Sequence, residues 1–417
     1  MEGKEKKILI AVIAILLIAG IAFVGLKAAG LIEKKVDKPT EEPTPEEPIT
    51  PRDDLKDDLV FAFLKLENDK KNKIYSPLSI RYALQVLGEG ADGETKEQLD
   101  AVLSEYKTTK YGAIKDHLGF GNALFIRDTY FKNVKQDYLD IVKEKYDAEI
   151  LEDKFENAKN INAWIEEKTL GLIKDFLRDQ QVSNPNNKLI IVNALAMDMN
   201  WVHQFDGENT HGSEFTKIDG KTMRANMMSE TFKDDNLAYY QDDDVTAVRM
   251  NLEEYEGKQF EFYAIMPKEN LPEYIEKFEL EEFNRVTKDM KNASAQTGGV
   301  NLSIPRFDFE TDLEFVNDLK SLGVVNVFSP EDADLSKISE ASHLYVGDAL
   351  HHAKIEFSEK GVKAAAVTVI IIKDSAMPLE ENPLFIQFDK PFMFVIKDKQ
   401  TNDIWFVGAV YEPEEAK

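Results

Sequence analysis

Residues 359–389 read EKGVKAAAVTVIIIKDSAMPLEENPLFIQFD and join two different kinds of sequence. Residues 364–372 are small and then β-branched, which is typical of a strand buried on both faces. Residues 373–383 are polar and interrupted by prolines, which is typical of an exposed loop. Such a segment would tend to aggregate, unless the protein keeps it exposed and later inserts it into a sheet. The alternative is an ordinary buried strand of an α/β enzyme, followed by a loop.

The two ends of this stretch resemble the serpin family, of the prokaryotic type. The hinge that precedes a serpin reactive loop is matched by Glu359, Gly361, Ala364, Ala365, Ala366 and Thr368. The C-terminal strands of the family are matched by Phe388, Lys390, Pro391, Phe392, Gly408, Val410 and Pro413. Val362, in the hinge, and Lys363 stand where many inhibitory members have threonine and glutamate. The loop is about five residues longer than usual in the family.

The resemblance covers roughly residues 53–413 and implies an α+β fold. That fold has three β-sheets, about eight or nine helices and an exposed reactive-centre loop, in a metastable state. A target serine protease cleaves the loop and forms an acyl-enzyme, after which the cut loop inserts into the large sheet and distorts the protease. Serpins are themselves the standard example of such insertion. The implied partner is therefore a serine protease, held covalently by a monomeric inhibitor.

The scissile bond is expected between Ser375 and Ala376, by counting the customary seventeen positions from Glu359. A serine at this place would suit an elastase-like or subtilisin-like protease. The alternatives are Met377 and Leu379, which would suit chymotrypsin-like or subtilisin-like pockets, and Lys373, which would suit a trypsin-like pocket.

The hinge sequence is compatible with insertion because side chains alternate between the two faces of a strand. One face would carry Val362, Ala364, Ala366, Thr368, Ile370 and Ile372, and it has no charge. The other face carries lysines only at its ends, Lys363 and Lys373. We therefore expect insertion to survive the departures from the family pattern.

Two groups of residues resemble parts of the serpin machinery that controls insertion. The sheet-opening network is matched by Ser76, Ser79, Asn193 and His351, and the breach, where the loop first enters, by Trp201, Arg306 and Glu359. Capping of a helix by Ser76 and core packing of Trp201 are the simpler interpretations. His351 could make sheet opening depend on pH. A metal site at His351 is not expected, because no spaced carboxylates lie nearby. Ala225 and Asn226 stand where a valine and a proline are more usual.

Individual segments have predictable structures. Strands are expected at 122–126, 189–205, 260–267, 300–309 and 345–357. A helix broken near Thr169 and Gly171 is expected at 162–176, and a helix followed by a turn at 312–328.

The N-terminus predicts export. Residues 8–26 contain no charge and follow three lysines, so residues 1–32 are a signal anchor with a membrane helix or a cleaved signal peptide. Residues 33–52 contain five of the chain's fifteen prolines and form a linker, and residues 53–417 form the serpin domain. The domain is expected to be extracellular, either membrane-anchored or secreted.

The composition excludes several classes of function. The chain has no cysteine, which rules out disulfides and thiolate chemistry. The formal net charge is −26, which disfavours nucleic acid and a heparin-like cofactor. GxSxG, HExxH and phosphate-binding motifs are absent, so no enzyme and no cofactor are expected. Two alternatives remain: a non-inhibitory serpin that acts as a carrier, chaperone or surface module, and an exported enzyme with unfamiliar catalytic residues.

Overall fold

A computed structural model of the 417-residue chain describes the folded body. The described residues are 52, 55, 58–104, 109–341, 343–362 and 382–416. They belong to one compact unit, Thr50–Lys417. The expected membrane segment and linker lie outside the described residues, as does 363–381 of the loop. Among the described residues, no helix combines the length and the apolar character needed to cross a bilayer.

The described part of the chain contains nine α-helices and eighteen strands. The helices are α2 (Leu59–Leu66), α3 (Pro77–Glu89), α4 (Gly93–Leu103), α5 (Gln136–Tyr146), α6 (Lys159–Lys168), α7 (Asp179–Ser183), α8 (Leu271–Lys277), α9 (Leu280–Lys288) and α10 (Val316–Ser321). The first nine strands are β1 (Lys73–Tyr75), β2 (Leu118–Arg127), β3 (Glu149–Asp153), β4 (Leu189–Met197), β5 (Met199–Asn200), β6 (His211–Thr216), β7 (Thr222–Phe232), β8 (Leu237–Gln241) and β9 (Val245–Asn251). The others are β10 (Phe260–Pro267), β11 (Lys291–Asn292), β12 (Val300–Pro305), β13 (Phe307–Glu314), β14 (Leu350–Phe357), β15 (Gly361–Val362), β16 (Leu384–Gln387), β17 (Phe392–Asp398) and β18 (Ile404–Val410).

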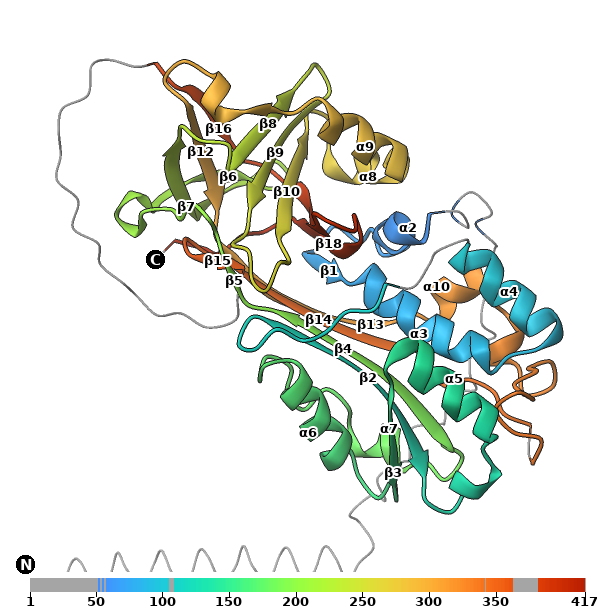
Figure 1. Ribbon diagram of the computed structural model, residues 1–417. Coiled ribbons are helices and arrows are strands. Elements are labelled where there is room, and N and C mark those ends of the chain that lie inside the picture. The colour runs from blue at the N-terminus through green and yellow to red at the C-terminus, as the bar shows by residue number, and fades with distance from the viewer. Residues whose placement is uncertain are drawn as a thin grey trace, which may run out of the picture. The chain divides into compact units, whose positions relative to one another are not determined.

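The large sheet consists of two groups of strands that lie side by side in Figure 1. One group has the order β3-β2-β4, and the other has the order β13-β14-β15-β5. Because β5 continues the chain directly after β4, the short strands β5 and β15 connect the two groups at one end. Elsewhere β4 and β14 face each other without pairing among the described residues.

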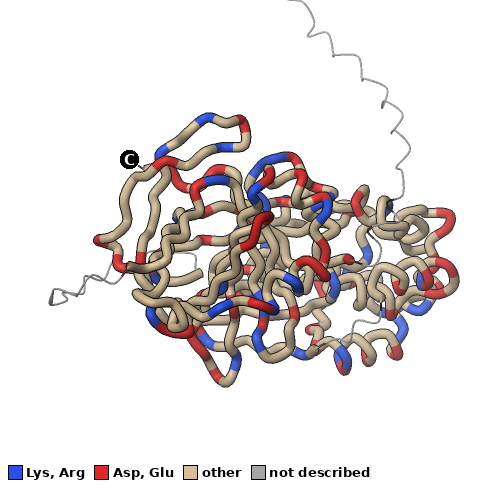
Figure 2. Tube along the Cα trace, turned by 90° about the horizontal axis from the view of Figure 1, so that it is seen from above, with Lys and Arg blue, Asp and Glu red and all other residues tan. Residues whose placement is uncertain are grey.

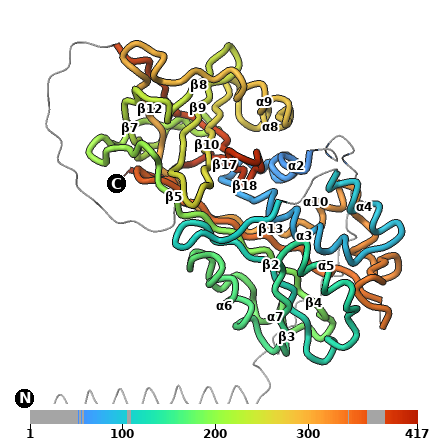
Figure 3. The backbone as a smooth tube through the Cα atoms, viewed as in Figure 1, coloured from blue at the N-terminus to red at the C-terminus, as the bar shows by residue number. Residues whose placement is uncertain are grey.

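Two further sheets lie toward the end of the large sheet that carries β5, as the positions of β7, β9, β10 and β12 in Figure 3 show. A seven-stranded sheet has the order β1-β18-β17-β10-β9-β8-β11, and a four-stranded sheet has the order β16-β12-β7-β6. The core between the large sheet and the seven-stranded sheet is aromatic. Phe307 and Phe357 stack with centroids 4.6 Å apart, and Phe262 of β10 packs on Phe357 at 4.7 Å. This aromatic core holds β13 and β14 against the rest of the body.

The α+β class, the helix number and the serpin arrangement expected from the sequence are confirmed. The strand expected at 260–267 is β10, and residues 300–309 are divided at Arg306 between β12 and β13. The helix expected at 312–328 is wrong in its first part, because β13 continues to Glu314 and pairs along its length with β14. The break expected near Thr169 in the helix at 162–176 is confirmed, since α6 ends at Lys168.

The end of α6 has a local cause. The Thr169 hydroxyl donates to the Ile165 carbonyl oxygen at 2.7 Å, and Gly171 adopts a left-handed backbone with φ +75°. A threonine whose side chain binds the preceding turn, followed by a residue with positive φ, favours termination of a helix. Of the segment expected to be helical, Trp164 therefore lies within α6 and Phe176 lies after its end.

Candidate hinge and insertion slot

The hinge enters the large sheet at β15. Val362 pairs with Phe357 of β14 on one side and with Met199 of β5 on the other, while Gly361 pairs with Asn200. Val362 is 4% exposed, as expected for the uncharged face of the inserted strand. Two residues of the hinge are thus already incorporated before the part of the loop that lies outside the described residues.

Gly361 is required by the closeness of this pairing. A Cβ atom at this position would lie 2.0 Å from the Met199 carbonyl oxygen and 2.7 Å from the Asn200 Cα. These are backbone atoms of a paired strand, so they cannot move aside without breaking the pairing.

Trp201 lies immediately below the entering hinge. Its backbone N–H donates to the Lys360 carbonyl oxygen at 2.7 Å, and its indole Nε1–H donates to the Ser358 carbonyl oxygen at 2.9 Å. The ring is 1% exposed and packs on Phe357 at 5.3 Å. Trp201 therefore serves both as core packing and as a support for the hinge backbone.

Arg306 and Glu359, predicted to form a pair, do contact each other. Arg306 Nη1 lies 3.6 Å from Glu359 Oε1, and the Thr210 hydroxyl donates to the same oxygen at 2.7 Å. Both charged side chains are partly exposed, so the pair stabilises the fold by at most about 1 kcal/mol. Its effect is to fix the position of the residue that precedes the hinge strand.

Below the hinge, a cavity of about 730 Å³ separates β4 from β14. Its walls include Ile190 and Val192 of β4 and His351 of β14, and Ser76 and Leu84 from the α3 region form its floor. We call this cavity the insertion slot. Unpaired strand edges are templates for a further strand. The slot lies further along β4 and β14 than β15 does, and Val362 lines a separate cavity of about 20 Å³ with Met197 and Ile355.

His351, in the wall of the slot, and the start of α3, in its floor, form a hydrogen-bonded unit. The backbone N–H of Ser76 donates to His351 Nε2 at 3.0 Å, and the Ser76 hydroxyl accepts the N–H of Ser79 at 3.1 Å as a helix N-cap. Burial, followed by the neighbouring His352, lowers the pKa of His351 to about 3. The imidazole is therefore neutral and available as an acceptor at neutral pH. Three of the four predicted network residues meet here.

Asn193, the fourth predicted network residue, has different partners. Its side-chain amide donates to Asn122 Oδ1 at 2.7 Å, and Asn122 donates to the Tyr146 carbonyl oxygen at 2.8 Å. Its own Oδ1 is buried and accepts no hydrogen bond from the described residues. Asn193 thus lines the slot from the β4 side, opposite His351.

Comparison with known proteins identifies the chain. The family model described as serpin (serine protease inhibitor) matches residues 58–413. The chain belongs to the serpin family. An uncharacterized serpin-like protein of Methanosarcina acetivorans is 30% identical to it over 372 residues, with 84% of each chain covered.

Two solved structures of other proteins resemble this serpin in fold. The thermophilic serpin tengpin in its native state has a TM-score of 0.69 and 26% identity, covering 87% of this chain and 94% of that chain. Thyroxine-binding globulin in complex with thyroxine has a TM-score of 0.70 and 25% identity, covering 87% of this chain and 99% of that chain. The serpin fold alone therefore does not fix a single activity.

Among the described residues, the charged side chains form no basic patch or metal site that would suggest a function other than that of the hinge and slot. Figure 2 shows lysine and arginine interspersed with aspartate and glutamate along the described chain. Within the same residues, no group of three or more His, Asp or Glu side chains could hold a metal ion.

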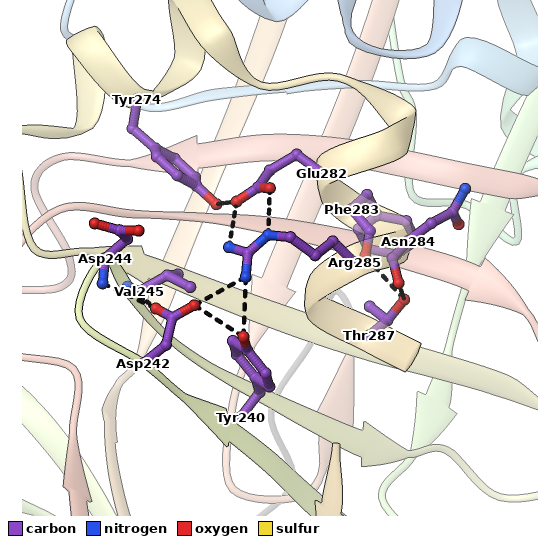
Figure 4. Close-up of polar contacts among 10 residues, drawn as sticks. All are labelled: Tyr240, Asp242, Asp244, Val245, Tyr274, Glu282, Phe283, Asn284, Arg285 and Thr287. Atoms are coloured by element: carbon purple, nitrogen blue, oxygen red, sulfur yellow. Dashed lines mark hydrogen bonds and ion pairs between the residues drawn. The ribbon is translucent and has the colours of Figure 1, made fainter. Parts of the chain in front are cut away.

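The ion-pair cluster around Arg285, drawn in Figure 4, has a structural role. Arg285 of α9 donates from Nε and Nη2 to the Glu282 carboxylate at 2.6 and 2.7 Å, and from Nη1 to Asp242 Oδ2 at 2.9 Å. Although partial burial opposes it, the hydrogen bond from Arg285 lowers the pKa of Asp242. Because Arg285 already binds two carboxylates, the cluster ties α9 to the β8–β9 turn instead of attracting an anion.

Some expected site residues lie outside the described part of the chain. They are the hinge residues Ala364, Ala365, Ala366 and Thr368, and the cleavage positions Lys373, Ser375, Ala376, Met377 and Leu379. Conversely, sequence reasoning missed Thr210 and Glu414, which both reach the breach. The one available signal was Asn226, which departs from the usual proline.

Proposed function

We propose that this serpin inhibits serine proteases as a suicide substrate. The protease cleaves the loop and is trapped as an acyl-enzyme while the cut loop fills the slot. The observation that carries the proposal is the hinge itself: Gly361 and Val362 already pair as a strand between β14 and β5, and the unfilled slot lies further along the same sheet, between β14 and β4.

The chemistry of the slot supports this reaction. Each residue added to β15 would supply backbone hydrogen bonds to the facing edges of β4 and β14, worth roughly 0.5 to 1.5 kcal/mol each. Burial of Ile370 and Ile372 would add roughly 1.5 to 3 kcal/mol each. Cleavage frees one end of the loop, which couples this gain to the reaction with the protease.

For the target, we propose a subtilisin-like, elastase-like or chymotrypsin-like protease that cleaves after Ser375, with Met377 as the next candidate. The full chain would be incubated with one protease of each class and with a trypsin-like protease. Denaturing gels would reveal a covalent complex of summed mass, and mass spectrometry of the released peptide would give the cleaved bond. Cleavage by all four without any covalent complex would refute inhibition.

A non-inhibitory carrier is the second candidate, because thyroxine-binding globulin shares the fold. A carrier should bind its ligand without a protease, and cleavage need not be followed by insertion. The uncharged inserted face of the hinge favours the inhibitor, since a carrier has no need of it.

We also propose that residues 1–32 export the serpin domain, either as a signal anchor or as a cleaved signal peptide, and that residues 33–52 form the spacer. Fractionation of expressing cells, with and without external protease, checks this. We expect external protease to degrade the serpin domain when the cells are intact. Full protection of the domain in intact cells would contradict export.

A further inference from the structure

The C-terminal segment reaches the breach at Glu414, and the C-terminal label in Figure 1 is beside β15. The backbone N–H of Glu414 donates to the Arg306 carbonyl oxygen at 3.0 Å. The N–H of Arg306 donates to the Asn226 carbonyl oxygen at 2.9 Å, and the N–H of Asn226 donates to the Glu414 carbonyl oxygen at 3.1 Å. These three bonds close a ring that ties the start of β13 to β7 through the C-terminal segment.

Asn226 makes this ring possible. A proline at this position, the more usual residue in the family, has no N–H and could not donate to Glu414. The Asn226 side chain adds a second bond, since its Nδ2 donates to Glu414 Oε1 at 3.1 Å. The departure of this sequence from the family pattern therefore fixes both the backbone and the carboxylate of Glu414.

The fixed carboxylate in turn faces Arg306. Glu414 Oε2 lies 3.3 Å from Arg306 Nε, while Nη1 of the same guanidinium lies 3.6 Å from Glu359 Oε1. The two carboxylates use different nitrogens, so they bind at the same time and do not compete. With its Nε held by Glu414, the long Arg306 side chain has less rotamer freedom to lose when it pairs with Glu359.

We propose that Glu414 is a positioning residue for the hinge: it orients Arg306 toward Glu359 and so keeps Gly361–Val362 paired in the large sheet. Through this contact the C-terminal segment keeps the first residues of the loop paired in the sheet before the rest of the loop inserts. The consequence for inhibition rests on the proposed function, whereas the effect on the hinge does not.

Amide hydrogen exchange tests the proposal in the uncleaved full chain. Exchange is followed in peptides that span Phe357–Val362 and Met199–Trp201. In Glu414→Gln, exchange of these peptides should be about threefold to fivefold faster, as expected for loss of a half-exposed ion pair. Asn226→Pro should act in the same direction, because it removes both hydrogen bonds that Asn226 donates to Glu414.

Glu415→Gln is the matched control. Glu415 is exposed and pairs with Ala225 through its backbone, so the substitution removes the same charge one residue away. It should leave hinge exchange within about 1.5-fold of the parent, given the small effect of isolated surface charges.

An Arg306→Gln background separates positioning from mere structural support. If Glu414 acts through Arg306, then Glu414→Gln has no further effect on hinge exchange in that background. An equal effect in both backgrounds, or unchanged or slower exchange in the single variant, would overturn the proposal.

Inhibition supplies an independent measurement. A less paired hinge should insert more slowly, so that deacylation more often releases the protease before insertion is complete. With a protease that forms a covalent complex, Glu414→Gln should therefore consume more inhibitor molecules per protease trapped. If no protease forms a complex but hinge exchange responds as described, the inhibitor assignment fails and the role of Glu414 stands.

Discussion

His351 gives the protein a defined response to acid. Its ordinary pKa is about 6.5, and burial, with His352, lowers it to about 3 in the native state. The native protein therefore binds this proton only near pH 3, whereas the unfolded chain binds it below about pH 6.5. The stability that the neutral imidazole contributes is present above pH 6.5 and is lost as the pH falls toward 3.

We predict that His351→Gln removes this acid sensitivity. Urea unfolding of the parent between pH 7 and pH 4 should show an additional loss of up to about 1.4 kcal/mol per pH unit relative to the variant. The exposed His211 provides the control, since His211→Gln should follow the parent. Parallel curves for the parent and His351→Gln would show that the proton is not linked to folding at this residue.

Gly361→Ala is predicted to expel the hinge from the sheet. The added methyl group would overlap the Met199 carbonyl oxygen, and overpacking of this kind costs about 1 to 3 kcal/mol. Amide exchange of Met199–Trp201 should rise, and the urea midpoint should fall. Gly112→Ala is the control, since a Cβ there meets nothing within 4 Å; if both variants behave alike, the close approach at Gly361 is not what holds the hinge.

Single residues also show what sequence alone could reveal. The pairing of Arg306 with Glu359 and the grouping of Ser76 with His351 could be predicted, because each residue lies in a segment that resembles the family. Glu414 could not be predicted, because its contact with Asn226 joins residues 188 positions apart and it lies just after Pro413, the last residue that matches the family pattern. A departure from the usual residue was visible at Asn226, but its partner was not.

At the scale of elements, boundaries were harder to predict than identities. The strand β10 was predicted to the residue because all eight of its side chains are buried and apolar composition marks it. The strand β14 begins at Leu350, five residues later than expected, because residues 345–349 line the slot outside the ladder. Pairing partners decide where such a strand starts, and these are not visible in local composition.

The slot and the hinge face together predict a pair of contrasting variants. Thr368→Arg would place a charge on the face expected to be buried after insertion, whereas Val367→Arg would place it on the opposite face. After loop cleavage, calorimetry should show a large rise in melting temperature for the parent and for Val367→Arg. Thr368→Arg should lose most of that rise, and equal rises in both variants would contradict the face assignment.

The whole molecule carries a formal net charge of −26, and residues 1–52 contribute none of it because eight acidic residues there balance eight basic ones. At about 0.01 M salt this field extends roughly 30 Å, and at 0.1 M it extends only about 10 Å. A basic protease should therefore be attracted over a longer distance at low salt, and an acidic protease should be repelled.

We predict that the second-order rate constant of complex formation falls several-fold for a basic protease between about 0.01 M and 0.15 M salt. It should rise over the same range for an acidic protease. Heparin should change either rate by less than about twofold at 0.15 M salt, because a protein of this charge repels a polyanion. Discontinuous assays of residual protease activity measure the rate constant for the basic protease, for the acidic protease and for either one with heparin. A tenfold acceleration by heparin would show that a local basic site overrides the total charge, which the interspersed lysines and arginines of Figure 2 argue against.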